Sequence, residues 1–275
     1  MQPGAGSIRV GVGGWTYEPW RGSFYPAGLA RGRELEFASR RLTAIEINGT
    51  YYGTQKPESF SKWHAETPEN FVFAAKASRH ATNRRVLADS GEAIERFIGS
   101  GIAHLGAKLG PILWQFMPTK RFEPQDFEAF LALLPQSVEG RALRHVMEVR
   151  HATFRSPQYL ALARRFRVAT VFADTDEYPS FADVTGDLVY ARLQRSRPEV
   201  ATGYEAGALD AIADCARLWA SGSEPAIAPR IEPPQAAGVA RDVFILFIGG
   251  AKERAPAAAQ ALIARLGGTH PRESG

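Results

Sequence analysis

Eight short apolar segments alternate with helical patterns along this chain, and this alternation limits the possible folds more than any other feature. Each segment is rich in β-branched or aromatic residues and ends in glycine or polar residues, which is typical of buried parallel strands. We predict strands at residues 8–14, 44–50, 71–77, 109–116, 145–150, 168–174, 188–194 and 244–249. We predict helices at residues 34–41, 58–66, 92–103, 125–134, 158–166, 208–220 and 257–266.

Eight strand–helix units favour an α/β fold of the TIM type, a (β/α)8 barrel. A doubly wound open sheet is the alternative, but no G-x-G-x-x-G sequence follows the first strand. Residues 175–187 are too few and too polar for a full crossover helix, so we expect the barrel to be degenerate around the sixth unit. Residues 221–242, rich in Pro and Ala, are expected to form an irregular connection.

The chain length of 275 residues suits a single large domain. We predict one barrel domain at residues 8–267, a disordered tail at residues 1–7 and a frayed end at residues 268–275. No apolar run is long enough to span a bilayer and no signal peptide is evident, so we expect a cytoplasmic protein without a membrane partner. The single cysteine, Cys215, excludes an internal disulfide and a Cys-based zinc site. The oligomeric state is left open.

Polar residues alternate with apolar ones near the ends of several predicted strands. Ile45 and Ile47 share one parity, while Glu46 and Asn48 share the other. Polar residues on one side of a buried strand belong at the carboxyl end of a barrel, where the strand ends meet. We therefore expect the following side chains to converge there: Glu46, Asn48, Lys76, Gln115, Glu148, Arg150, Asp174, Arg192 and Gln194.

Two interpretations of this convergence stay open. The first is an internal ion-pair network, in which Glu46, Glu148 and Asp174 compensate the buried cations. The second is a catalytic site, for which the candidates are Glu46, Lys76, Glu148 and Asp174. In that site Lys76 is a general base or electrophile with a lowered pKa, and Glu46 or Glu148 transfers protons. Arg150 and Arg192 would hold a phosphate or carboxylate.

Aromatic and basic residues follow the predicted strands as well. The candidate ligand-binding residues outside the strand ends are Trp15, Tyr17, Trp20, Tyr25, Tyr52, Arg79 and His151. The aromatic residues form either a lid over the core or a platform for a ligand. Arg84 and Arg85 extend the basic run after Arg79, and the net charge is +4. Cations beside stacking rings suit a nucleotide or single-stranded nucleic acid, whereas a solvated basic rim is the simpler alternative.

A metal cofactor is a further hypothesis. Glu46, Glu148 and Asp174 can form an oxygen site for Mg²⁺ or Mn²⁺. The six histidines show no zinc-binding spacing. His151, beside Arg150, has the best position among them, although a lone histidine is more often structural.

Several stretches of this sequence resemble the YecE-like family, domain of unknown function 72. They are GGWTY at 13–17, WRGSFYP at 20–26, EINGTYY at 46–52, FAAKASR at 73–79, LGPILWQ at 109–115 and EVRH at 148–151. Weaker agreement continues at 189–192 and 255–259. The resemblance implies a TIM barrel and no settled activity. This chain departs from the family pattern at Asn83, where the family often has His, and at Gly249 and Gly250, where it often has Asn.

Two functional hypotheses follow. The first is a TIM-barrel enzyme that acts on a phosphorylated or otherwise anionic substrate, by hydrolysis or lyase chemistry. The second is a non-catalytic nucleic-acid-binding protein that uses the basic and aromatic residues.

Overall fold

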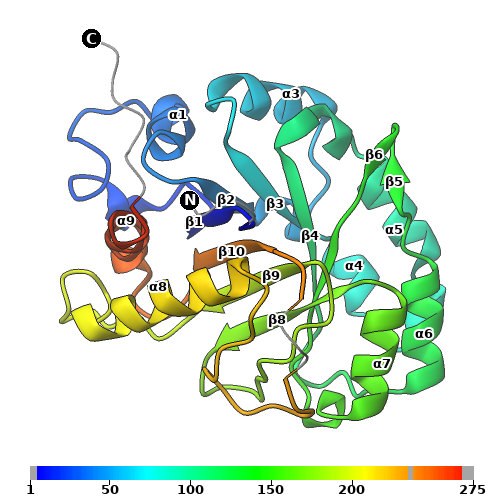
Figure 1. Cartoon of the computed structure of the whole chain (residues 1–275). Helices are drawn as coiled ribbons and strands as arrows, with labels where there is room; N and C mark the ends of the chain where they lie inside the picture. Colours follow the sequence, from blue (N-terminus) through cyan, green and yellow to red (C-terminus); the bar gives the residue numbers. More distant parts are fainter. Residues whose placement is uncertain (1–4, 235–237, 268–275) are drawn as a thin grey trace.

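The computed structural model describes residues 5–234 and 238–267. Eight parallel strands close into a barrel in the order β1-β10-β9-β8-β7-β4-β3-β2, as the sequence predicts. Figure 1 shows the strands in the centre with the longer helices around them. The barrel strands are β1 Ile8–Gly13, β2 Ala44–Ile47, β3 Val72–Lys76, β4 Leu109–Gln115, β7 His145–Glu148, β8 Ala169–Asp174, β9 Leu188–Leu193 and β10 Asp242–Phe247. A small hairpin, β5 Ser137–Val138 and β6 Arg141–Ala142, lies outside the barrel.

Helices follow most of the strands and cover the outside of the barrel. The α-helices are α1 Glu34–Ser39, α2 Gly49–Tyr52, α3 Pro57–Glu66, α4 Arg79–Thr82, α5 Gly91–Ile98, α6 Pro124–Ala132, α7 Pro157–Arg165, α8 Ala206–Ala220 and α9 Ala255–Arg265. The 3₁₀ helices are η1 Glu18–Trp20, η2 Arg31–Arg33, η3 Leu87–Ser90, η4 Ile102–Lys108, η5 Ala152–Phe154 and η6 Lys252–Arg254. Proline lies in the first turn of α3, α6, α7 and α9. Backbone N–H groups in the first turn make no hydrogen bond within the helix, so proline, which lacks this group, is tolerated there.

Two predicted elements are shorter than expected by three residues or more. The helix predicted at 92–103 ends at Ile98, because Gly99 caps it and Gly101 has a φ of 103°, which L-residues avoid. A Cβ atom on Gly101 would also lie 2.8 Å from Pro57 Cα. The strand predicted at 44–50 ends at Ile47, and the residues Gly49–Tyr52 form the short helix α2.

The sixth unit is degenerate, as predicted. Residues 175–187 contain no helix, and the described part of 221–241 contains neither helix nor strand. The two segments lie together instead: Ala182 N donates to Pro229 O, and the buried carboxylate of Asp183 accepts the N–H groups of Ile231 and Glu232. These two irregular segments, joined by hydrogen bonds, thus take the place of a crossover helix beside β8.

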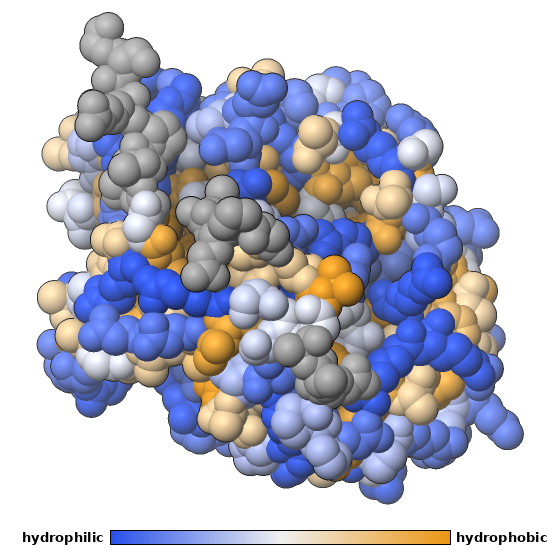
Figure 2. Space-filling model, in the orientation of Figure 1, coloured by the Kyte–Doolittle hydropathy of each residue, from blue (hydrophilic) through white to orange (hydrophobic). Residues whose placement is uncertain are grey.

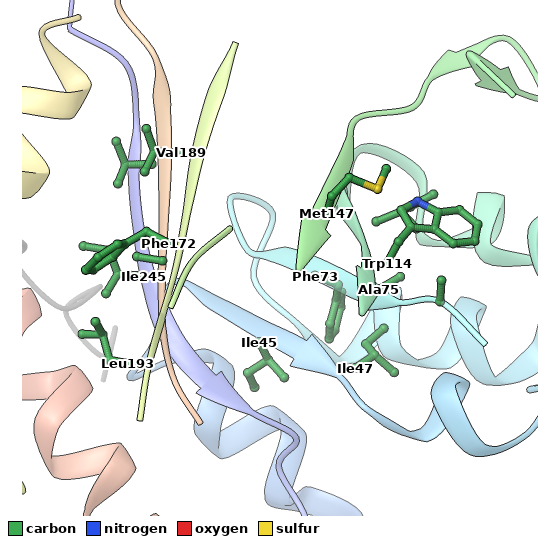
Figure 3. Packing of buried hydrophobic residues seen from close by; sticks show 14 of the residues in the cluster. Ile45, Ile47, Phe73, Ala75, Trp114, Met147, Phe172, Val189, Leu193 and Ile245 are labelled. Atoms are coloured by element: carbon green, nitrogen blue, oxygen red, sulfur yellow. The ribbon is translucent and has the colours of Figure 1, made fainter. Parts of the chain in front are cut away.

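Alternation along the strands separates two apolar cores. The outward residues pack against the helices, and Figure 3 labels Ile45, Ile47, Phe73, Ala75, Trp114, Met147, Phe172, Val189, Leu193 and Ile245 among them. The inward residues form a smaller core inside the barrel, in which the rings of Tyr190 and Phe244 stack with centroids 6.1 Å apart. Strand residues two positions further along then face the carboxyl end of the barrel.

The start of the described chain is tied to the barrel. Gly6 N donates to Ala220 O, and Ser7 hydrogen-bonds Asp242 Oδ1 through both its N–H and its hydroxyl. Gly6 and Ser7, at the end of the segment predicted as a tail, thus hydrogen-bond to the barrel. Residues 1–4 and 268–275 of the predicted tails lie outside the described residues.

No helix in the part of the chain that the structure describes is long and apolar enough to cross a bilayer. Hydrophilic residues cover most of the face drawn in Figure 2, and the apolar residues on it form separate groups.

Candidate active site at the carboxyl end of the barrel

A layer of polar side chains lies directly above the inner apolar core. On five strands the inward apolar residue is followed, two positions later, by a polar one: Ala44 by Glu46, Ala74 by Lys76, Leu113 by Gln115, Val146 by Glu148 and Tyr190 by Arg192. Because inward positions recur every second residue, these five side chains all point into the barrel near its carboxyl end. Together with Arg150 we call them the charged cluster.

Arg192 lies between the two carboxylates of the charged cluster. Its Nη2 and Nε donate to Glu46 Oε1 and Oε2 at 2.9 and 3.1 Å, and its Nη1 donates to Glu148 Oε2 at 2.6 Å. Arg192 is 4% exposed, Glu46 0% and Glu148 1%. Buried charges of this kind are tolerated only when they are paired and hydrogen-bonded. The internal ion-pair network that the sequence suggested is therefore present.

The charges in this network shift each other's pKa values. Burial alone would raise the pKa of Glu148, but Arg192 and Arg150 outweigh it and hold that pKa at about 2. Burial alone would lower the pKa of Arg192, but Glu148 and Glu46 outweigh it and raise that pKa. Both groups of the Arg192–Glu148 pair stay charged near neutral pH.

Neutral side chains fill the remaining hydrogen-bonding positions of the carboxylates. Tyr190 OH donates to Glu46 Oε2 at 2.9 Å, and Tyr178 OH donates to Glu148 Oε1 at 3.0 Å. Gln194 Nε2 donates to Tyr178 OH at 2.5 Å. Burial, with the negative charge of Glu148, raises the pKa of Tyr178 to about 12, so this hydroxyl remains a donor. Every carboxylate oxygen of Glu46 and Glu148 accepts at least one hydrogen bond.

Arg150 and Gln115 extend the charged cluster toward solvent. Arg150 Nη2 donates to Gln115 Oε1 at 3.0 Å and to Glu148 Oε1 at 3.2 Å, and its guanidinium lies 4.5 Å from the ring centroid of Tyr178. Gln115 Oε1 also accepts from Arg192 Nη1 at 3.2 Å. Arg150 Nε is buried and has no hydrogen-bond partner among the described residues. One donor of this guanidinium is thus unused.

Within the charged cluster, Lys76 has the fewest hydrogen-bond and ion-pair partners among the described residues. The side chain is 7% exposed, and Nζ lies 4.3 Å from the ring centroid of Tyr51. Among residues 5–234 and 238–267, no side chain or carbonyl makes a hydrogen bond or ion pair with Nζ. Burial and the nearby charge of Arg192 lower the pKa of Lys76 to about 8, although Glu46 and Glu148 act in the opposite direction. A substantial fraction of this amine is neutral near physiological pH.

Asp174 does not join the charged cluster, contrary to the sequence-based expectation. Ala173, rather than Asp174, pairs with Arg192 in the β8–β9 register and so shares its inward side. Asp174 pairs with the outward Leu193 and forms an ion pair with Arg195 at 3.2 Å. Burial raises the pKa of Asp174, which lines an outer cavity of about 620 Å³ with Phe172, Leu193 and Cys215.

The predicted oxygen site for Mg²⁺ or Mn²⁺ is not assembled, because Asp174 faces away from Glu46 and Glu148. Within the described residues no three His, Cys, Asp or Glu side chains are grouped so as to hold a metal ion.

The aromatic loop after β1 packs mainly as a lid over the core. Trp20 and Tyr25 are fully buried, and their polar atoms donate to Lys252 O and Trp15 O. Trp15 packs edge-on against Trp63 and Phe73. Tyr17 is partly exposed, with Lys252 Nζ 4.5 Å from its ring centroid. Of these four candidate ligand contacts, Trp15 and Tyr17 are partly accessible.

The remaining candidates lie around the charged cluster. Asn48 is partly exposed beside β1, where a Cβ atom on Gly13 would lie 3.0 Å from its Nδ2. His151 Nδ1 caps η5 by accepting Thr153 N, which is a structural role. Tyr52 is 66% exposed and lies 6.0 Å from the exposed guanidinium of Arg79.

The candidate site residues chosen from the sequence do not include Tyr51, Tyr178 and Tyr190. The parity of Tyr190, which is that of Arg192 on β9, is visible in the sequence. The contacts of Tyr51 and Tyr178 depend on loop conformations that the sequence pattern does not specify.

The comparisons with known proteins agree with this architecture. The family described as “Protein of unknown function DUF72” matches residues 9–274. The protein YecE of Escherichia coli (strain K12) is 25% identical over 147 residues, which cover 54% of this chain and 50% of YecE. YecE of Escherichia coli O157:H7 matches with the same figures. The chain thus spans about half the length of the curated relatives it matches.

Solved structures show the same fold. A DUF72 family protein from Thermotoga maritima MSB8 has a TM-score of 0.71 and 19% identity, and the match covers 95% of this chain and 99% of that chain. A DUF72 family protein from Enterococcus faecalis V583 has a TM-score of 0.69 and 18% identity over 95% of this chain and 98% of that chain. The structure named SacUVDE has a TM-score of 0.55 and 10% identity over 95% of this chain and 100% of that chain. At these identities the likeness concerns the fold alone.

Proposed function

This chain belongs to the DUF72 family of proteins of unknown function, and we propose that it is an enzyme that acts on an anionic small molecule at the carboxyl end of the barrel. The substrate is phosphorylated or otherwise anionic, and the chemistry is that of a hydrolase or lyase. Carboxyl ends of TIM-barrel strands carry the active sites of enzymes with this fold.

One observation carries the proposal: the charged cluster contains an excess buried cation. Within residues 5–234 and 238–267, the three cations Lys76, Arg150 and Arg192 face two carboxylates, Glu46 and Glu148. The carboxylates are fully used by the arginines and tyrosines, whereas Lys76 Nζ and Arg150 Nε have no acceptor in the described part of the chain. A site with surplus positive charge and unused donors is suited to an anion.

The geometry assigns different roles to the two kinds of charged residue. Glu148, with a pKa of about 2, is ionised and hydrogen-bonded, so it is a poor proton donor near neutral pH. We assign Glu46 and Glu148 to holding Arg192 in place. Lys76 is the reacting group, because a pKa close to the working pH leaves part of this amine neutral. Arg150 binds the anionic group of the substrate.

Calorimetric titration with inorganic phosphate and pyrophosphate tests this proposal. We expect saturable binding at one site, and a loss of affinity of about 10- to 100-fold in Arg150→Gln and Lys76→Met, because a charge-assisted hydrogen bond contributes about 1.5–3 kcal/mol. Lys62→Met is the matched control, since Lys62 is exposed and pairs only with Glu66. Thermal melting verifies that each variant is folded. The absence of saturable binding, or equal binding by all variants, would contradict the proposal.

Nucleic-acid binding is the second candidate, and the exposed pair of Tyr52 and Arg79 favours it. Arg84 and Arg85 are exposed on the same segment. Replacing these three arginines by Ala is then expected to weaken binding of a single-stranded oligonucleotide and to reduce its salt dependence, because fewer counterions are released. Unchanged affinity at both low and high salt would rule this candidate out.

A further inference from the structure

The position of Lys76 places a reactive amine where a substrate would meet it. Lys76 is the last residue of β3 and lies on its inward side, above Ala74 of the inner core. Its carbonyl accepts a hydrogen bond from Thr50 Oγ1 at 2.7 Å, which fixes the end of the strand. The backbone of Lys76 is thus held, while Nζ lies 4.3 Å from the ring centroid of Tyr51 and makes no hydrogen bond to a described residue.

The surroundings favour a nucleophilic amine over other reacting groups. The carboxylates of Glu46 and Glu148 are occupied by hydrogen bonds, so neither is free to attack a substrate. A general base is commonly oriented by a third group, but no hydrogen-bond partner of Nζ lies within the described residues. A lysine amine desolvated beside another cation is a recognised form of activated nucleophile.

We infer that the substrate of this site is an anionic aldehyde or ketone, and that Lys76 Nζ forms an imine with its carbonyl carbon while Arg150 holds its anionic group. This inference rests on the proposed function, because the same site binds the anion. It goes beyond that function by naming the chemical class of the substrate and the covalent step.

The step is balanced without a further reactant. The lone pair of the neutral amine forms the N–C bond, and the π electrons of the carbonyl move to oxygen. Both amine protons are transferred to that oxygen, which leaves as water when the C=N bond forms. Protonation of the imine from solvent restores the positive charge that Glu46 and Glu148 face in the free enzyme. The iminium then withdraws electrons from the neighbouring carbon, which is what lyase chemistry requires.

Trapping with pyridoxal 5′-phosphate and sodium borohydride tests the inference, because this probe combines an aldehyde with a phosphate. Borohydride reduces the imine to a stable secondary amine, and peptide mapping assigns the label among the six lysines of the chain. At pH 8 about half of an amine with a pKa of about 8 is neutral, against well under 1% of an exposed lysine. We therefore expect Lys76 to be labelled about 100-fold faster than exposed Lys62.

Three comparisons make the result specific. Pyridoxal, which lacks the phosphate, should label Lys76 at least about tenfold more slowly, and inorganic phosphate should protect it. Lys76→Arg should lose the label but keep the charge and the fold. Lys252→Met should keep the label on Lys76; it is the matched control, because burial also lowers the pKa of Lys252 beside Tyr17 and Trp20.

The outcomes separate the two proposals. If the lysines are labelled in proportion to their exposure while calorimetry still shows phosphate binding, the inference of an imine is wrong and the proposed anion-binding function remains. If both aldehydes label Lys76 at the same rate and calorimetry shows no phosphate binding, the substrate is not anionic and the proposed function is wrong. Phosphate-dependent label on Lys76 supports both.

Discussion

At the scale of single residues, Lys76 and Arg192 show opposite ways of holding a buried cation. Arg192 has planar donors that match two carboxylates, and its charge is compensated within the charged cluster. Lys76 is nearly as buried, but its charge has no direct counterion among the residues described. An amine kept in this state costs stability, which is expected of a reacting group and not of a structural one.

Lys76→Met is therefore expected to stabilise the protein at pH 7. The folded-state pKa of about 8 lies below the ordinary value of 10.5, so protonation of Lys76 opposes folding. This pKa shift corresponds to a gain in stability of up to about 3 kcal/mol for the variant. Loss of the contact between Lys76 and Tyr51 reduces that gain. The contribution of Lys76 to stability is fully present above a pH of 10.5 and is lost as the pH falls through about 8. The difference in the free energy of unfolding between Lys76→Met and the wild type should therefore decrease as the pH rises from about 8 to 10.5.

Urea unfolding of the wild type and Lys76→Met at about pH 7 and about pH 10 measures this difference. Lys62→Met should show no such pH-dependent gain, since Lys62 is exposed. Marked destabilisation by Lys76→Met at neutral pH would mean that the amine is a stabilising member of the ion network.

At the scale of elements, the missing helix beside β8 is replaced by packed irregular chain. Asp183 is 4% exposed, and its two carboxylate oxygens accept Ile231 N at 2.9 Å and Glu232 N at 3.0 Å. Arg164 of α7 pairs with Glu232 at 2.5 Å and adds a second attachment. The segment after α8 is thus fixed by side chains rather than by secondary structure.

Asp183→Asn should release this segment. An amide oxygen can accept one of the two N–H groups, and its NH₂ group faces the other, so we expect a loss of about 1–3 kcal/mol. Local opening should rise correspondingly, and trypsin should cleave after Arg230 about 5- to 150-fold faster under native conditions. Limited proteolysis with mass spectrometry measures the cleavage rate.

Asp187→Asn is the control for this experiment, because Asp187 belongs to the same connection but is exposed. Equal cleavage after Arg230 in wild type and Asp183→Asn would show that other contacts hold the segment.

The turn after the last strand, β10, restricts which residue can stand at position 250. Gly250 has a φ of 63°, and a Cβ atom there would lie 2.5 Å from Ser196 O. An L-residue would be strained and would clash with the chain after β9. The Gly-Gly pair that departs from the family pattern therefore fits the tight packing of this turn. The structure offers no account of Asn83, which is exposed at the end of α4.

At the scale of the whole molecule, the two ends of the barrel serve different purposes. At the amino end, Arg144 Nη1 pairs with Asp242 Oδ2 at 2.6 Å, and the same carboxylate binds Ser7. Burial raises the pKa of Asp242, but hydrogen bonds from Ser7 and Arg144 outweigh it and lower that pKa overall. These contacts join the start of the chain, the residue before β7, and β10, although Arg144 Nε is buried and has no hydrogen-bond partner among the described residues. The carboxyl end contains Lys76, whose amine has no direct counterion in the part of the chain that the structure describes, as expected when one end stabilises the barrel and the other binds a ligand.

The sequence by itself determined the strands, the closed barrel and most of the charged cluster. A strand has a period of two, so alternation alone assigned Glu46, Glu148 and Arg192 to the inward side. Most predicted helix ends lie within two residues of those in the structure. Asp174 was misplaced because the pattern did not show that Ala173, one residue earlier, shares the level of Arg192.

Only the tertiary structure decided which charges pair and which amine is left over. Arg192 meets Glu46 across 146 residues of sequence, and Glu148 across 44. Local pattern carries no information on such distant partners, on the burial of Trp20 and Tyr25, or on the isolation of Lys76 Nζ. These properties depend on the distances between side chains of different strands, which are set when the barrel closes.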